Sequence, residues 1–270
     1  MVVQHNLSAM NTNRQLGIVT DSMSKSTEKL SSGYRINRAA DDAAGLSISE
    51  KLRSQIRGLD KAASNSQDGI SLIQVAEGAL NETHSILQRM NELATQAAND
   101  TNTSTDRNAI AAEMNQLTSE IDRVHSTTQF NTMNLLDGKF KGKFIQVGSM
   151  KGQTITISIN KMDAHSIGVS GLAVSSNTSA SESMSKIQNA IQSVSDQRAK
   201  LGAIQNRLEH TINNLNTTSE NTAAAESRIR DTDMASEMVE YSKNNILQQA
   251  GQSMLAQANQ QTQGVVSLLQ

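Results

Sequence analysis

The stretch that decides the fold is residues 52–97, LRSQIRGLDKAASNSQDGISLIQVAEGALNETHSILQRMNELATQA. Apolar or small side chains recur along it at alternating steps of four and three residues. Such a seam, sustained over several heptads, is typical of a long amphipathic helix that packs against partner helices. A helix over residues 45–98 would be about 80 Å long at about 1.5 Å per residue. The seam runs through Leu52, Ile56, Leu59, Ala63, Ser66, Ile70, Ile73, Leu80, Leu87, Met90, Ala94 and Ala97.

The same spacing predicts two more helices downstream. Polar residues 99–106 predict a loop, with Thr105 or Asp106 as the N-cap of a helix that ends near Phe130. Another helix follows the Ser-, Asn- and Thr-rich residues 175–181. Because each helix carries a seam, the helices must pack on one another to bury it. The two seams are Ile110, Met114, Leu117, Ile121 and Val124, and then Met184, Ile187, Ile191, Val194, Leu201, Leu208, Ile212 and Leu215.

A short β region is predicted in the middle of the chain. The pair Asp137–Gly138 is a hairpin turn signal. Residues 144–147 and 154–159 are predicted strands, and the second alternates strictly between Thr or Ser and Ile. The predicted fold is therefore mainly α: a long coiled-coil helical bundle from both chain ends, with a small β-hairpin region in the middle.

Both chain ends are free of charge. Residues 1–13 and 244–270 contain no Lys, Arg, Asp or Glu, yet each end carries heptad-spaced apolar residues. An uncharged amphipathic helix at a free end normally needs a partner surface. Either the ends pair within one monomer, or they are poorly ordered alone and fold on assembly. The residues expected to mediate assembly are Leu16, Met23, Leu30, Leu247, Ala250, Met254, Val265 and Leu268.

The composition excludes several classes of protein. The chain has no Pro, Cys or Trp, only 2% aromatic residues and a net charge of −2. These values exclude disulfides and thiolate metal sites, and they imply no basic face for nucleic acid. No apolar run is long enough for membrane insertion, and the N-terminus does not resemble a cleaved secretory signal. The protein therefore stays inside the cell or leaves by a route without signal cleavage.

No constellation of catalytic residues is present. The five histidines form no metal-binding spacing, so we expect no metal, no cofactor and no enzyme. The adjacent Asp41 and Asp42 more simply start a helix, where an acidic side chain offsets the helix dipole. The isolated helical glycines Gly78, Gly202 and Gly251 are predicted points of close packing.

Three long blocks carry a family resemblance. Residues 30–46 read LSSGYRINRAADDAAGL, residues 68–82 read DGISLIQVAEGALNE, and residues 242–259 read SKNNILQQAGQSMLAQAN. In this order and at these places, the blocks closely resemble bacterial flagellins. The resemblance implies an inner terminal coiled-coil domain from residues 1–44 and 231–270. It further implies a rod-like helical domain over 45–230 with a β region at about 138–174, and a minimal form without variable outer domains.

The resemblance also implies a function. Flagellins are structural subunits of the extracellular flagellar filament, a helical homopolymer that serves motility. They are exported unfolded by the flagellar type III export apparatus with the help of an export chaperone, and they meet hook–filament junction and cap proteins. A junction or cap-like protein with coiled termini is one alternative. An enzyme on a helical scaffold or a cytoplasmic coiled-coil adaptor is another, and neither of these predicts uncharged, matched ends.

Flagellins are also ligands of Toll-like receptor 5, and residues 87–94 resemble their receptor-facing helix. On that resemblance Gln88, Arg89 and Leu93 are central, with Glu113 from the neighbouring helix. An exposed Arg beside an apolar anchor is typical of a binding hot spot. The alternative is that Arg89 is an ordinary solvated side chain and Leu93 belongs to the bundle or to a filament contact.

Overall fold

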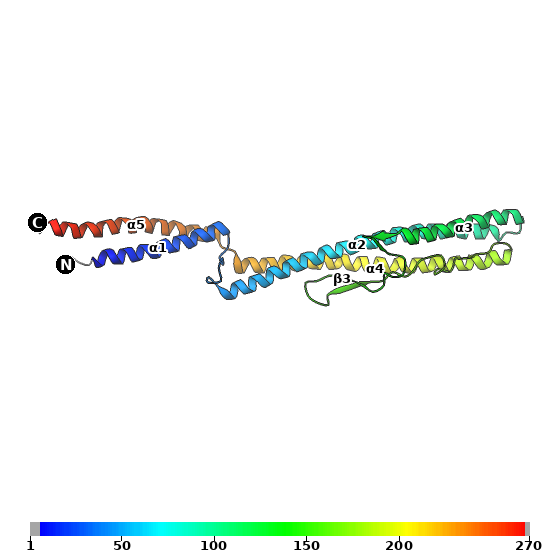
Figure 1. The fold of residues 1–270 in the computed structure, drawn as a ribbon, viewed down its shortest axis with the longest axis horizontal. Helices are drawn as coiled ribbons and strands as arrows, with labels where there is room; N and C mark the ends of the chain where they lie inside the picture. Colours follow the sequence, from blue (N-terminus) through cyan, green and yellow to red (C-terminus); the bar gives the residue numbers. More distant parts are fainter. Residues whose placement is uncertain (1–5, 268–270) are drawn as a thin grey trace. The chain divides into compact units, whose positions relative to one another are not determined.

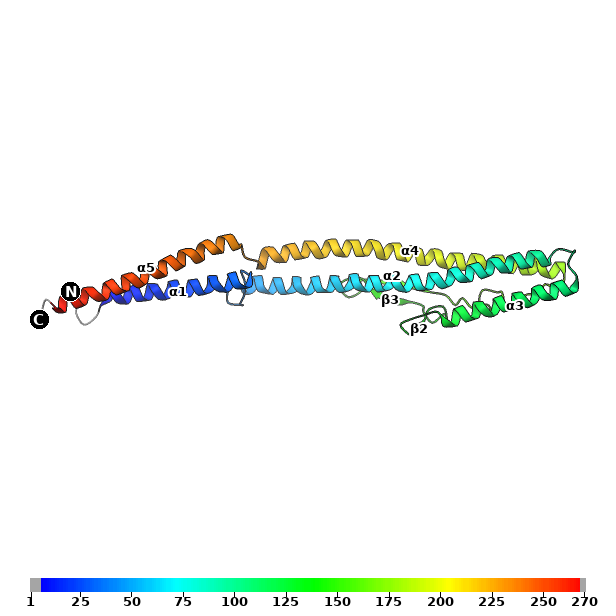
Figure 2. The same ribbon diagram turned by 90° about the horizontal axis from the view of Figure 1, so that it is seen from above.

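The computed structural model describes residues 6–267 of the backbone and the side chains of residues 6–261. Five helices and two small antiparallel sheets follow one another along this part of the chain (Figure 1, Figure 2). The chain divides into two compact units: residues 1–55 with 221–270 form the first, and residues 56–220 form the second. The mainly α prediction with a small central β-hairpin region is confirmed.

The helices have the extents that the apolar spacing predicts, to within a few residues. Helix α2 covers Ala43–Ala97, close to the predicted 45–98, and α3 covers Ser104–Thr127. Helix α4, Asn177–Arg230, begins inside the polar segment that was expected to precede it. The first unit also contains α1, Leu7–Ser32, and α5, Met234–Ser267.

The core of the second unit is aliphatic. Leu80 and Leu87 of α2, Ile121 of α3 and Val194 and Leu201 of α4 are all fully buried in one cluster. Each such side chain stabilises the fold by about 1.5–3 kcal/mol relative to exposure. Because the seam residues recur every three or four positions, they lie on one face of each helix, and the contact extends along the helices. The helices lie side by side in Figures 1 and 2.

The N-cap of α3 is Thr103, so the prediction of Thr105 or Asp106 was wrong. The Thr103 side chain accepts a hydrogen bond from the Asp106 backbone, and the Asp106 carboxylate accepts one from the Thr103 backbone at 2.9 Å. This reciprocal capping box satisfies two backbone donors at once. Asp106 therefore acts as the third helical residue, and a cap at either predicted position would have lost this exchange.

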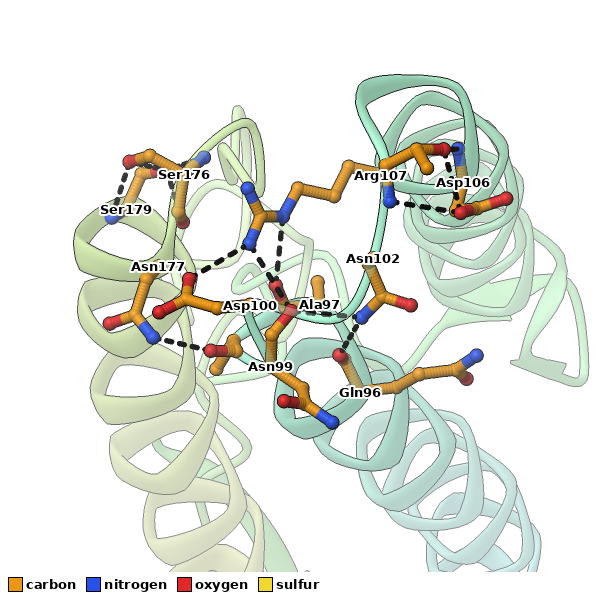
Figure 3. A network of polar contacts seen from close by, with 12 residues as sticks. Gln96, Ala97, Asn99, Asp100, Asn102, Asp106, Arg107, Ser176, Asn177 and Ser179 are labelled. Atoms are coloured by element: carbon orange, nitrogen blue, oxygen red, sulfur yellow. Dashed lines mark hydrogen bonds and ion pairs between the residues drawn. The ribbon is translucent and has the colours of Figure 1, made fainter.

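The C-terminal end of α2 is closed by side chains of α3 and α4 (Figure 3). The Arg107 side chain is only 15% exposed, and its guanidinium donates to the carbonyls of Ala97 at 3.1 Å and Asn99 at 3.2 Å. The amide of Asn177, at the start of α4, donates to the Ala98 carbonyl. The last carbonyls of a helix lack partners within it and carry negative partial charge, so these donors satisfy them.

The first hairpin turns at an unexpected place. Strands β1, Gln129–Phe130, and β2, Met133–Asn134, pair antiparallel. The two residues between them, Asn131 and Thr132, have φ of 46° and 64°. Positive φ at both central positions is the requirement of the tight hairpin turn that matches the twist of the strands.

The predicted turn at Asp137–Gly138 joins no pair of strands, so that prediction was wrong. The Asp137 carboxylate accepts a hydrogen bond from the Lys139 backbone at 2.9 Å, and Gly138 has φ of 78°. This is a local bend stabilised by an Asp side chain, which uses the same residues as a hairpin turn does.

The predicted strands 144–147 and 154–159 are confirmed as a second hairpin. Strand β3, Lys143–Gln146, pairs antiparallel with β4, Thr154–Ile157. Ile155 and Ile157 point into the helical core, at 6% and 0% exposure, while the threonines between them face outward. The strict alternation therefore reports one buried face and one solvated face.

The segment after β4 is anchored by two aspartates. The Asp122 carboxylate of α3 accepts a hydrogen bond from the Ala164 backbone at 2.9 Å. Asp163 accepts from Lys161 Nζ at 2.7 Å and from the Ser166 backbone at 3.1 Å. Burial of the Asp163 carboxylate raises its pKa, but the hydrogen bonds from Lys161 and Ser166 outweigh this effect and hold the pKa at about 2.

We predict that Thr132→Gly stabilises the second unit by about 0.5–1 kcal/mol. A β-branched residue at φ of 64° carries a steric cost that glycine lacks, and this gain exceeds the backbone entropy that glycine loses on folding. Urea unfolding followed by circular dichroism measures the change. Asn131→Gly is the matched control and should increase the stability less, since Asn tolerates positive φ. Destabilisation by Thr132→Gly would contradict the prediction.

Asp163 should make the second unit sensitive to acid. Its folded pKa of about 2 lies below the ordinary value of 3.8. The contribution of Asp163 to the free energy of unfolding is therefore complete above about pH 4, and it is lost as the pH falls towards about 2. Asp163→Asn should lower stability at pH 7 by about 1–2 kcal/mol and flatten the decline in this acid range. Parallel acid curves for the variant and the wild type would refute this prediction.

Candidate assembly and receptor sites

The first unit is built on an antiparallel pair of helices, α1 and α5. The Asn6 side chain donates to the Ala258 carbonyl at 2.8 Å, and Lys29 Nζ lies 3.4 Å from a carboxylate oxygen of Glu237. These two contacts lie near opposite ends of α1, so the helices run alongside each other between them (Figure 1). The two charge-free ends thus pair within one chain.

The predicted assembly residues of α1 lie on the side that faces α5. A β-carbon placed on Gly251 of α5 would lie 3.2 Å from a methyl group of Leu16. Met23 and Leu30 follow at intervals of seven residues and are half-buried like Leu16. Leu16 therefore packs against α5, and the heptad spacing places Met23 and Leu30 on the same side of α1. The predicted close packing at Gly251 is confirmed, whereas the space around Gly78 and Gly202 is open and those two predictions were wrong.

The face of α5 that meets α1 is mostly polar or small. Asn244 on this face is 4% exposed, and its amide nitrogen donates no hydrogen bond within the described residues. A buried polar group without a partner costs about 1–3 kcal/mol. The α1–α5 pair is therefore weak as an isolated two-helix unit. This polar seam, spaced by four and three, consists of Glu237, Tyr241, Asn244, Gln248, Gly251, Leu255 and Ala258.

The predicted assembly residues of α5 do not lie on the seam. Leu247 is 44% exposed and Met254 is 62% exposed, and Ala250 is also exposed. Their role in filament assembly stays a prediction, and the structure places them on a different side of α5 from the one that meets α1. The side chain of Val265 and the whole of Leu268 lie outside the described residues.

These exposed residues form an apolar stripe with two others. Val239 is 70% exposed and Ile246 is 66% exposed. At about 100° per residue, all five side chains fall within about a third of the helix circumference, away from the polar seam. Exposed apolar patches of this kind mark interaction surfaces. This outer stripe consists of Val239, Ile246, Leu247, Ala250 and Met254.

The block 30–46 builds a clasp between the two halves of the chain. The Gly33 carbonyl accepts from the Thr232 backbone at 3.0 Å, and the Arg35 backbone donates to the Arg230 carbonyl at 2.6 Å. The Arg230 guanidinium lies 4.7 Å from the centre of the Tyr34 ring. Pattern reasoning missed this clasp because it joins residues about 200 positions apart that have no periodic spacing.

The clasp continues into the start of α2. The Asp42 carboxylate accepts a hydrogen bond from the Gly45 backbone at 2.8 Å, so the predicted helix start is confirmed. Gly45 is required by close approach, because a β-carbon there would lie 2.8 Å from a methyl carbon of buried Ile36. The Asp41 carboxylate accepts instead from the backbone of Asn37 and Arg38.

Three of the predicted receptor residues cluster on the surface of the second unit. Arg89 is half-exposed and bridges two carboxylates, with nitrogens 3.0 Å from Glu113 and 3.1 Å from Glu92. Gln88 is exposed next to it and shares a hydrogen bond of 3.0 Å with the ring of His84. The long-range ion pair places α2 and α3 side by side at this point.

Leu93 is placed differently from the expectation. Its side chain is 2% exposed and belongs to the helical core. The expected apolar anchor beside Arg89 is therefore not on the surface of the folded unit. A role in receptor binding stays a prediction for Gln88, Arg89 and Glu113, which the structure leaves accessible.

An apolar groove lies between α2 and the two hairpins of the second unit. Its volume is about 460 Å³, and all three phenylalanines of the chain line it. Phe144 is 72% exposed and Met133 is 43% exposed at its mouth. Sequence reasoning missed this groove, because Phe130, Phe140 and Phe144 are brought together only by the hairpins.

Over residues 6–267, no group of three or more His, Cys, Asp or Glu side chains is arranged to hold a metal ion. Over the same range, no helix combines the length and hydropathy that crossing a bilayer requires.

Long helices, a polar inner seam and an exposed apolar stripe define a structural protein that associates with other chains. Comparison with known proteins identifies its family. The bacterial flagellin N-terminal helical region matches residues 3–141, and the bacterial flagellin C-terminal helical region matches residues 184–269. The chain belongs to the bacterial flagellin family.

Individual relatives agree with this assignment. The chain is 55% identical to a flagellin of Halalkalibacterium halodurans, and the alignment covers 100% of both chains. It is 48% identical to a flagellar filament 33 kDa core protein of Treponema phagedenis, again over 100% of both. The crystal structure of Bacillus cereus flagellin is similar with a TM-score of 0.52 and 36% identity, covering 60% of this chain and 94% of that one.

Family membership settles two predictions. Flagellins are structural proteins of the extracellular flagellar filament, so the prediction that the chain is not an enzyme is confirmed. The chain is also a minimal member, because its full-length match to the relative of Halalkalibacterium halodurans spans 271 positions.

Proposed function

We propose that this filament subunit is exported unfolded through the flagellar type III apparatus and self-assembles through α1 and α5 into a homopolymer that serves motility. An export chaperone would hold the chain before export, and hook–filament junction and cap proteins would meet it at the two ends of the filament. The absence of Pro and Cys supports this route. Without them the chain threads with no disulfide and refolds with no slow proline isomerisation.

The observation that carries the proposal is the outer stripe. A helix pair with a polar seam and an exposed apolar stripe gains little by pairing alone, and it gains more when other copies cover the stripe. Burying one Leu, Ile, Val or Met contributes about 1.5–3 kcal/mol. Contacts between different surfaces of identical subunits that do not close into a ring generate helical filaments.

The domain assignment belongs to the same proposal. Residues 1–44 and 231–270 would form the inner terminal coiled-coil domain, and residues 45–230 the rod-like domain with its β region at about 138–174. The breaks in helical structure at the clasp support a boundary there, since α1 ends at Ser32 and α4 ends at Arg230.

The outer stripe predicts a specific assembly defect. Leu247→Asp places a carboxylate where an apolar contact would exclude water, and an unpaired buried charge is strongly unfavourable. We expect the critical concentration for seeded polymerisation to rise at least about tenfold, with the helix content of the monomer unchanged. Sedimentation and electron microscopy of the polymer measure the effect.

Gln249→Asp is the matched control for added charge. Gln249 is exposed on α5 but lies outside both the stripe and the polar seam. The critical concentration of this variant should stay within about twofold of the wild-type value. An equal loss in both variants would assign the effect to charge on α5 in general, and wild-type polymerisation of Leu247→Asp would exclude the stripe from assembly.

A second proposed activity is binding to Toll-like receptor 5 through Gln88, Arg89 and Glu113. The exposed ion pair between Arg89 and Glu113 supports it, because this contact orients a planar guanidinium on the surface. The same surface could instead serve filament contacts. Binding is therefore best measured with the monomer.

Arg89→Ala should lower the affinity of the monomer for the receptor ectodomain at least about thirtyfold, the loss expected for a hot-spot residue. Helix content should not fall, because alanine favours helix. The control is Arg123→Ala, which removes an exposed arginine of α3 that pairs with Glu120. Wild-type affinity of Arg89→Ala would leave Arg89 as a filament contact or a solvated side chain.

A further inference from the structure

The described methionines range from fully buried to largely exposed. Met90 and Met114 are buried in the helical core, at 0% and 2% exposure. Met10 of α1 and Met254 of α5 are 63% and 62% exposed. The chain contains no Cys and no Trp, so methionine is the side chain that a peroxide oxidises most readily.

Met10 and Met254 lie at the same level of the α1–α5 pair. Asn6 contacts Ala258 on one side of this level, and Leu16 approaches Gly251 on the other. Met10 lies between Asn6 and Leu16 on α1. Because the helices are antiparallel, Met254 lies between the same two contacts on α5 and also belongs to the outer stripe.

We propose that Met10 and Met254 form an oxidation-sensitive site that decides whether the subunit can join a polymer. This inference rests on the proposed assembly through α1 and α5. The oxidant is hydrogen peroxide. A thioether sulfur attacks one peroxide oxygen, and the S–O bond forms as the O–O bond breaks. The other oxygen leaves as hydroxide, takes the proton from the sulfur-bound oxygen and becomes water. The sulfur loses two electrons, and the side chain becomes a polar sulfoxide.

The location makes this change costly for assembly. Residues 244–270 carry no charge, and the outer stripe around Met254 is aliphatic. A sulfoxide oxygen buried in such a contact would have no donor from these apolar neighbours, and burying an unpaired polar group is unfavourable. The monomer is little affected, because both side chains are solvated there.

The test is a competition within wild-type protein. Monomers are oxidised partially with hydrogen peroxide, added to filament seeds, and separated into polymer and supernatant. Peptide mass spectrometry then measures the sulfoxide fraction at each methionine. Sulfoxide at Met10 and Met254 should be depleted at least about tenfold in the polymer. Sulfoxide at Met150, 62% exposed in the second unit, should be distributed equally.

Two further measurements complete the test. Methionine sulfoxide reductases should restore polymerisation of oxidised wild-type protein. The variant with both Met10→Leu and Met254→Leu keeps apolar side chains and should polymerise after peroxide treatment, whereas Met150→Leu should remain sensitive. Equal distribution of all sulfoxides, or unimpaired polymerisation of oxidised wild type, overturns the inference. Failure of untreated wild type to polymerise would instead refute assembly itself.

Discussion

Burial of aliphatic side chains between α2, α3 and α4 is the interaction on which the second unit depends. The chain has no Trp and few other aromatic residues, so stability must come from many medium-sized side chains along great helical length. The capping box at Thr103 and the donors that close the end of α2 let these helices stop abruptly with their backbone groups satisfied. Strand β4 then packs its two isoleucines into this core and turns its threonines outward.

The first unit has the opposite distribution of polar and apolar side chains. Its two helices meet through polar and small residues such as Asn244 and Gly251, while leucine, isoleucine and valine side chains of α5 stay exposed. A protein that functioned as a monomer would gain by exchanging the two faces. Under the proposed assembly the arrangement has a physical reason, because the exposed apolar surface would then be covered by contacts between subunits.

The clasp near residues 33–46 and 230–233 explains why one of the family blocks has its composition. Gly33 adopts φ of 75°, which ends α1, and Gly45 permits the close approach of Ile36. Tyr34 and Arg230 join the two halves of the chain through a cation–π contact, and neighbouring backbone hydrogen bonds add to it. The residue types in this block therefore have a structural explanation. Each of these residues meets a steric or hydrogen-bonding requirement of the clasp.

The sequence by itself determined the helices, the position of the β region and the family, because period and composition act locally along the chain. It also determined that the ends are uncharged and amphipathic. Only the tertiary structure decided which side of α5 meets α1. The polar seam and the outer stripe both have helical spacing, so the spacing alone does not show which of them contacts α1. The buried position of Leu93 was likewise decided by packing in the core of the second unit. The gathering of three phenylalanines into one groove depends on hairpins whose turns the local signals misplaced.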